Sequence, residues 1–334
     1  MIEMPAGHKY STLALRVSHL TLRHTEPLDL GDNLWVTGEM PVALPGHWQT
    51  WLGSLKVEEL KSNNLFLHSH ASANSPGVLD HENEHLNEVV HRLYFATLIA
   101  APYIGHDDGT RMSGAHHEGA LDVRQVQPYD DILSAVGCHG AALDDGVFRL
   151  AKQIYDGLEQ VEGNGEHDRI WRIVRAFYAA LQDHQLGSRI HQLIRCVEGF
   201  VFPDQGRTRQ QMTSRSELFL GPGQHDLIQS LFDIRSAVEH LHGPARIVND
   251  ANPRDGNLRL AELCFKSEAL ARYCLRRLFT TPNLWPHFRD DAALGAFWAL
   301  PTAARAALWG ASMNLAVEFA LYNRRTAAIQ LDGP

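Results

Sequence analysis

Residues 10–71 alternate apolar with polar side chains and are rich in β-branched and aromatic types. Successive side chains of a strand point to opposite faces of a sheet, so this alternation predicts strands over 13–17, 34–37 and 64–68. A turn signal at 75–77 closes the region. The pattern therefore indicates a small β-rich region near the start of the chain.

After Asp80, a residue type that favours the N-cap of a helix, the apolar positions take helical spacing up to about residue 101. A strand pair is predicted around 111–127. Another helix is predicted at about 145–160, and the Gly-containing stretch 161–166 is the best candidate for a linker. We therefore place a domain boundary there, between a β-rich α+β domain at 1–160 and a helical domain at 161–334.

The second half of the chain contains an apolar stripe with the four-three-four-three spacing of one helix face. Its members are Leu227, Leu231, Ile234, Val238 and Leu241. The pattern predicts a core-facing helix that Gly243 and Pro244 stop. Arg235 and the two histidines His240 and His242 then lie on its last turns.

An arginine followed by histidine at the end of a helix, here Arg235-Ser236 with His240 and then a His242-Gly243 pair, resembles the motif of the HEPN ribonuclease superfamily, in its Apea-like branch. Two earlier segments extend the resemblance over about half of the chain. The stretch 189–200 is similar to a family helix that carries a glutamate near the active arginine, here Glu198. The stretch 214–221 is similar to the next family helix.

Two histidines fit this motif in different ways. The family spacing favours His240, whereas helix geometry favours His242, because seven residues at about 100° each make nearly two full turns and return His242 over Arg235. Both therefore remain candidates for the acid–base group.

These residue types suit RNA cleavage by attack of the 2′-hydroxyl on the neighbouring phosphorus. Imidazole exchanges protons near neutral pH, and the guanidinium of Arg235 presents several donors to phosphate oxygens, with Ser236 as a further polar group. Glu239 lies one helical turn after Arg235. A plain surface pair of Arg235 with Glu239 is therefore the alternative interpretation.

The resemblance implies a metal-independent endoribonuclease without a cofactor, with Arg235 on the phosphate and Glu198 orienting it. It also implies a homodimer in which two motif helices face a shared RNA cleft, as in family members that act in bacterial defence or toxin systems. The alternative is a non-catalytic HEPN-like module for dimerisation or RNA binding. The expected fold class is α+β, with the mixed N-terminal domain followed by an all-α bundle.

A second motif, His81-Glu82-Asn-Glu-His85, has the HExxH spacing of zinc peptidases, and His91 lies near the place of a third ligand. It immediately follows the expected helix cap at Asp80. On a continuous helix, His91 would lie about 15 Å along the axis from His81. A zinc hydrolase using His81 and His85 is therefore the weaker hypothesis.

Other polar groups are expected at the surface. His68 and His70 share one face of a predicted strand, and His116 and His117 fall in a predicted hairpin. Arg272 belongs to a basic cluster that is expected on a solvated helix face.

The 334 residues are 44% hydrophobic and 21% charged, which is typical of globular proteins with two domains. The net charge of −9 disfavours binding of nucleic acid through the overall charge of the protein, so RNA contact requires a local basic patch. The four cysteines lack metal-site spacing, and no apolar run is long enough to cross a bilayer. We therefore expect a cytoplasmic protein with reduced thiols.

Overall fold

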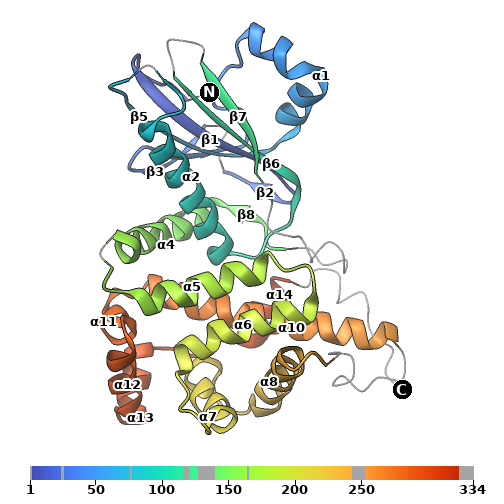
Figure 1. The fold of residues 1–334 in the computed structure, drawn as a ribbon, viewed down its shortest axis with the longest axis vertical. Helices are drawn as coiled ribbons and strands as arrows, with labels where there is room; N and C mark the ends of the chain where they lie inside the picture. The colour runs from blue at the N-terminus through green and yellow to red at the C-terminus, as the bar shows by residue number, and fades with distance from the viewer. Residues whose placement is uncertain are drawn as a thin grey trace. The chain divides into compact units, whose positions relative to one another are not determined.

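The computed structural model describes residues 2–23, 26–75, 77–115, 120–126, 140–163, 165–242 and 253–322. They form two compact units, of which the first extends to Tyr155 and the second begins at Asp156 (Figure 1). The first is an antiparallel sheet with helices, and the second is helical. The predicted α+β class is confirmed.

The first unit is built on one sheet with the strand order β3-β4-β5-β1-β6-β7. Its strands are all paired antiparallel. Their bounds are β1 His8–Val17, β3 Leu28–Gly31, β4 Leu34–Thr37, β5 Leu65–Ser72, β6 Gly105–Ala115 and β7 Leu121–Val126. The predicted strands at 13–17 and 34–37 fall in this sheet, as does 64–68 apart from its first residue. The described part of the predicted pair at 111–127 contributes to β6 and β7.

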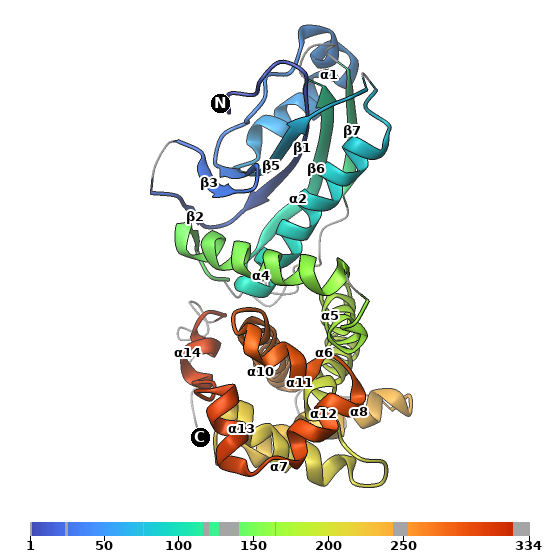
Figure 2. The same ribbon diagram turned by 90° about the vertical axis from the view of Figure 1, so that its left-hand side faces the viewer.

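Each face of the sheet packs against a helix (Figure 2). Helix α2, His81–Ala100, covers one face and starts as expected, because the Asp80 carboxylate accepts a hydrogen bond from the Asn83 amide. Helix α1, Gly46–Ser62, lies on the other face, where Leu60 packs with Tyr10 and Phe66. Helix α1 was not predicted from the sequence.

Helix α4, Asp145–Gly163, agrees with the helix predicted at 145–160 and is longer. The first residues of the expected linker, 161–163, are therefore its last turn. A short parallel sheet joins β2, Leu20–Thr21, to β8, Leu143–Asp144, just before α4 begins.

The second unit contains α5 and α6, then α7 and α8, and then the long α10. Their bounds are α5 Asp168–Leu181, α6 Leu186–Val201, α7 Thr208–Leu220, α8 His225–Glu239 and α10 Pro253–Phe279. Shorter elements follow, namely η1 Pro282–Leu284, α11 Trp285–Phe288, α12 Asp291–Ala299, α13 Thr302–Trp309 and α14 Leu315–Ala320. Helix α6 packs against α5, α8 and α10 and so lies at the centre of the unit.

The core of this unit combines an aromatic cluster with a buried ionic one. Phe200, Phe219 and Trp309 pack edge to face. Arg272, expected at the surface, is instead 2% exposed and donates to Glu268, which also accepts from Arg189. Among the described residues, no helix combines the length and apolar character that crossing a membrane requires.

Candidate functional site

Helix α8 carries the predicted motif and ends earlier than expected. Its last residue is Glu239, and His240 is the C-cap. Leu231 and Ile234 are buried as the stripe predicts, but Leu241 is 95% exposed. The expected stop at Gly243 and Pro244 lies outside the described residues, and the helix has already ended before it.

The early end has a local cause in the backbone. Leu241 adopts φ 58°, the left-handed conformation that usually requires glycine. The amide of His242 donates to the Ala237 carbonyl at 2.8 Å, and that of Leu241 donates to Val238 at 3.1 Å. These two bonds make a Schellman-type C-cap. His242 is therefore beyond the helix, and the helical geometry that favoured it over His240 does not apply.

Arg235 is enclosed by two carboxylates, one from each of two packed helices. Its Nη1 contacts Glu239 on α8 and its Nη2 donates to Glu198 on α6 at 3.4 Å. The Nε of Arg235 lies 3.4 Å from Oε1 of Glu198, and neither atom has a hydrogen-bond partner among the described residues. The Arg235 side chain is 21% exposed. The structure thus places Glu198 beside Arg235, as the resemblance implied, and also forms the predicted pair with Glu239.

The pKa of Glu198 reflects its burial and its long contacts with Arg235. Burial raises it, and the charge of Arg235 offsets only part of that effect, so the pKa lies above its ordinary value. Arg235 therefore faces one carboxylate that is costly to keep ionised and another, Glu239, whose side chain is 47% exposed.

His191 is a further member of this cluster that the motif analysis missed. His191, Arg195 and Glu198 recur at the four-three spacing of one face of α6. The pKa of His191 is lowered, first by burial and then by the charges of Arg235 and Arg195. The imidazole is therefore neutral near pH 7. The spacing from Glu198 was the available signal.

His240 and His242 lie together at the exposed end of α8. Their ring centroids are 6.4 Å apart, and both residues are exposed. Ser236 lies one turn before His240, and its backbone carbonyl accepts a hydrogen bond from the amide of His240 at 3.1 Å. The motif residues are thus one local group, in which His191 is the histidine coupled electrostatically to Arg235 and the other two face solvent.

Arg215, which belongs to the similar stretch 214–221, lies apart from this group. Its Nη1 donates to the carbonyls of Val201 and Phe202 at the end of α6, and its guanidinium lies over the Trp298 ring. It therefore stabilises the C-terminus of α6.

Comparisons with protein-family models, curated proteins and solved structures found no match to this chain.

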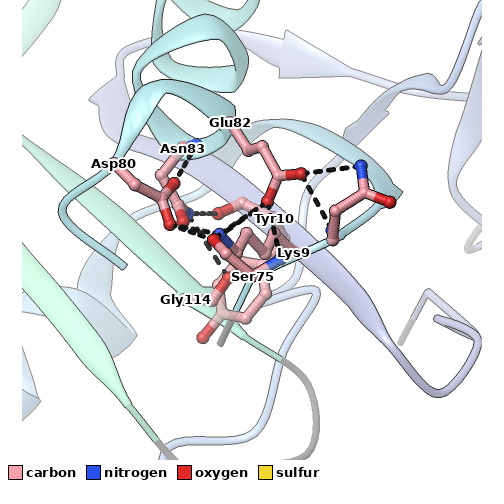
Figure 3. A network of polar contacts seen from close by, with 8 residues as sticks. Lys9, Tyr10, Ser75, Asp80, Glu82, Asn83 and Gly114 are labelled. Carbon is pink, nitrogen blue, oxygen red and sulfur yellow. Dashed lines mark hydrogen bonds and ion pairs between the residues drawn. The ribbon is translucent and has the colours of Figure 1, made fainter. Parts of the chain in front are cut away.

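The His81–His85 motif has a different geometry from a zinc site. His81 and His85 are exposed at the start of α2, whereas the Glu82 carboxylate turns away to Lys9, Asn74 and Ser75 (Figure 3). Lys9 is 1% exposed and also pairs with Asp80, which holds the pKa of both carboxyls below their usual range. No group of three or more His, Cys, Asp or Glu side chains that could hold a metal occurs among the described residues. Glu82 therefore supports the fold of the loop before α2, and a zinc hydrolase gains no support.

The strand histidines are buried, contrary to the expected surface position. His68 and His70 are 0% and 5% exposed, and Thr12 Oγ1 contacts His68 Nδ1 at 2.8 Å. Burial, with a smaller effect of His70, lowers the pKa of His68 to about 3. They are neutral members of the sheet core. His116 and His117 lie outside the described residues.

Proposed function

We propose that this protein is a metal-independent endoribonuclease of the HEPN type that acts as a homodimer, in the kind of role that defence or toxin proteins have. The observation that carries the proposal is the half-open cluster on α6 and α8. It contains the cation Arg235, whose Nε has no hydrogen-bond partner among the described residues, and the neutral imidazole of His191. His240 and His242 stand at the solvent-facing end of the same helix.

In this mechanism, the guanidinium of Arg235 binds the scissile phosphate and stabilises the negative charge of the pentavalent transition state. One imidazole removes the proton of the 2′-hydroxyl, whose oxygen attacks phosphorus. A second histidine, in its imidazolium form, gives its proton to the departing 5′-oxygen, so the products are a 2′,3′-cyclic phosphate and a 5′-hydroxyl. His240 and His242 are the candidates that the motif indicates for these roles, and His191 is the third histidine of the group. Ser236 is a further donor.

Leu241 supports the homodimer. It is an exposed leucine held in a left-handed conformation between the two histidines. A second copy of α8 would cover this apolar side chain and bring its own Arg235 and histidines to the same cleft.

The two carboxylates on Arg235 favour a second candidate function. Because Glu198 and Glu239 both pair with the guanidinium, a phosphate must displace at least one of them. A non-catalytic HEPN-like module that dimerises or binds RNA without cleaving it would retain this arrangement unchanged.

The test is cleavage of mixed RNA substrates in excess EDTA. Wild type is compared with Arg235→Ala/His240→Ala/His242→Ala and with His191→Ala. The control Arg175→Ala/His184→Ala removes an exposed arginine and an exposed histidine of α5 and its following turn. We expect cleavage by wild type and the control, a loss of at least about a hundredfold in the triple variant, and a smaller loss in His191→Ala.

Equal cleavage by wild type and the triple variant would refute the site. A folded dimer that binds RNA with the same affinity in every variant, and never cleaves it, would establish the non-catalytic function instead.

A further inference from the structure

The first unit contains a pocket of about 560 Å³ that the proposed ribonuclease site does not use. It lies between one side of α2 and the strands β6 and β7, on the face of the sheet that α2 covers. Arg111 and Arg124 come from the strands, and Asn87 and His91 come from the helix. Its volume is within the range of small-molecule sites.

The two arginines are direct neighbours across the strand pair. Arg111 of β6 is opposite Arg124 of β7, in the register that also pairs Ser113 with Asp122. Like charges in this position destabilise a sheet. The pKa of Arg111 is lowered by burial and then by Arg124, so the repulsion acts on a guanidinium that has already lost part of its hydration.

Among the described residues, carboxylates offset the charge of Arg111 and Arg124 only in part. Asp122 accepts a hydrogen bond from Nε of Arg124 at 2.8 Å. The Nε of Arg111 and the Nε2 of His91 are buried without a hydrogen-bond partner among the described residues. Burial and the charge of Arg111 lower the pKa of His91. Of the carboxylates that line the pocket, Asp122 is the one whose charge acts on Arg111, and Asp80, Glu84 and Glu88 line it as well.

The other lining groups set the size and charge of what can bind. Glu84 and Glu88 on α2 repel an extended polyanion such as RNA, whereas a ligand with one anionic group can keep its distance from them. Val78 and Leu79 supply an apolar wall, and Leu79 is 72% exposed. Asn87 is held in place because its Oδ1 accepts from Ser11 at 2.7 Å and from Ser113 at 2.6 Å.

We propose that this pocket binds a small organic phosphomonoester, with the phosphoryl group on Arg111 and Arg124 and the apolar part against Val78 and Leu79. A phosphoryl group carries nearly two negative charges and three acceptor oxygens, so it can bridge two guanidinium groups. A carboxylate ligand would bring one negative charge, which is no more than Asp122 already places beside the two arginines.

The experiment uses the full chain in a chloride buffer and three probes, namely inorganic phosphate, phenyl phosphate and benzoate. Calorimetric titration measures binding, and the melting temperature is recorded with each probe. We expect phenyl phosphate to bind most tightly and to raise the melting temperature, and inorganic phosphate to bind more weakly. Benzoate, which has the same ring but a carboxylate, is expected to show no binding.

Two variants separate the site from the fold. Arg124→Gln, at a side chain that is 57% exposed, should weaken phenyl phosphate binding on the order of tenfold or more and should not lower the ligand-free melting temperature, because it removes the repulsion from Arg111. The control Arg23→Gln changes an exposed arginine of the same unit that does not line the pocket, and it should bind like wild type.

Absence of phenyl phosphate binding to wild type at millimolar concentration would overturn the proposal. Binding of benzoate equal to that of phenyl phosphate would overturn the phosphoryl assignment. Equal weakening in Arg23→Gln and Arg124→Gln would show a general charge effect and would overturn the site.

Discussion

Two clusters in the second unit, in each of which arginine contacts glutamate, differ in how completely their charged groups are paired. In the core, Glu268 is 1% exposed and accepts from Arg189 at 2.8 Å, from Arg272 and from the Tyr322 hydroxyl at 3.3 Å. At the surface of α6 and α8, Arg235 and Glu198 approach only to 3.4 Å and leave a donor and an acceptor unused. The same residue types thus form a closed network in one place and an open one in the other.

The pKa directions express this difference. Burial raises the pKa of Glu268, but the two guanidinium charges and their hydrogen bonds outweigh it, so the pKa falls below the ordinary value. Around Glu198 burial prevails and the pKa rises. A network in which every charge is paired stabilises the fold. In a network whose charges are partly unpaired, a ligand can replace one of the partners.

The largest expected effect comes from breaking the closed network. Glu268→Gln leaves two buried guanidinium groups without their carboxylate, so we expect the free energy of unfolding to fall by about 3–5 kcal/mol. Urea unfolding measures this. The control is Glu262→Gln on the same helix, whose pair with Lys266 is 44% exposed on the glutamate side and should change stability by about 0.5 kcal/mol or less. Similar losses in both variants would contradict the comparison.

The two clusters should also respond to pH with opposite sign. Glu268 has a lowered pKa in the folded protein, so its stabilisation is present above the unfolded value of 4.5 and is lost as the pH falls through the folded pKa. Glu198 has a raised pKa, so its contribution is present below 4.5 and is lost as the pH rises through the folded pKa.

Urea unfolding from about pH 3.5 to 6.5 tests these signs. As the pH falls, the stability difference between wild type and Glu268→Gln should shrink. Over the same change, the stability of wild type should rise relative to that of Glu198→Gln. Parallel pH dependences would show that the two clusters are alike.

The smallest effect concerns the exposed side of the open cluster. Glu239→Gln removes a carboxylate that competes with RNA for Arg235, so we expect RNA to bind about two- to fivefold more tightly, a modest gain because solvent screens the pair. Binding to fluorescent RNA measures it. Glu217→Gln, which removes a carboxylate of similar exposure from the pair with His225, is the charge control. Unchanged affinity in Glu239→Gln would mean that Arg235 does not contact RNA.

Elements defined by local pattern were predictable from the sequence. Asp80 caps α2, and the alternating runs became β1, β4 and β5. Helix α1 was missed because Gly53 adopts φ 79° inside it and breaks the helical course, so its apolar residues do not form one stripe, and Trp51 and Leu55 remain exposed.

The environment of single polar residues depended on distant partners and was not predictable. Arg272 is buried between Glu268, one turn before it, and the hydroxyl of Tyr322, which comes from fifty residues later and accepts from its Nε. His68 is buried because Thr12 of the neighbouring strand contacts it. In the candidate site, Arg235, Ser236 and Glu198 were named from the motif, whereas the position of His242 depended on the conformation of Leu241. The family assignment, the dimer and the RNA substrate stay predictions.

Lys9 has a consequence for how the first unit opens. It sits inside β1 and holds Ser75 at 2.8 Å and Glu82 at 2.8 Å, together with Asp80. A single ammonium thus ties a central strand to the loop before α2 and to the first turn of that helix. Opening of the loop breaks the ion pairs of the ammonium with Asp80 and Glu82, so fraying from this end is opposed. Amide protons of the first turn of α2 should consequently exchange with solvent as slowly as those of β1, as one cooperative unit.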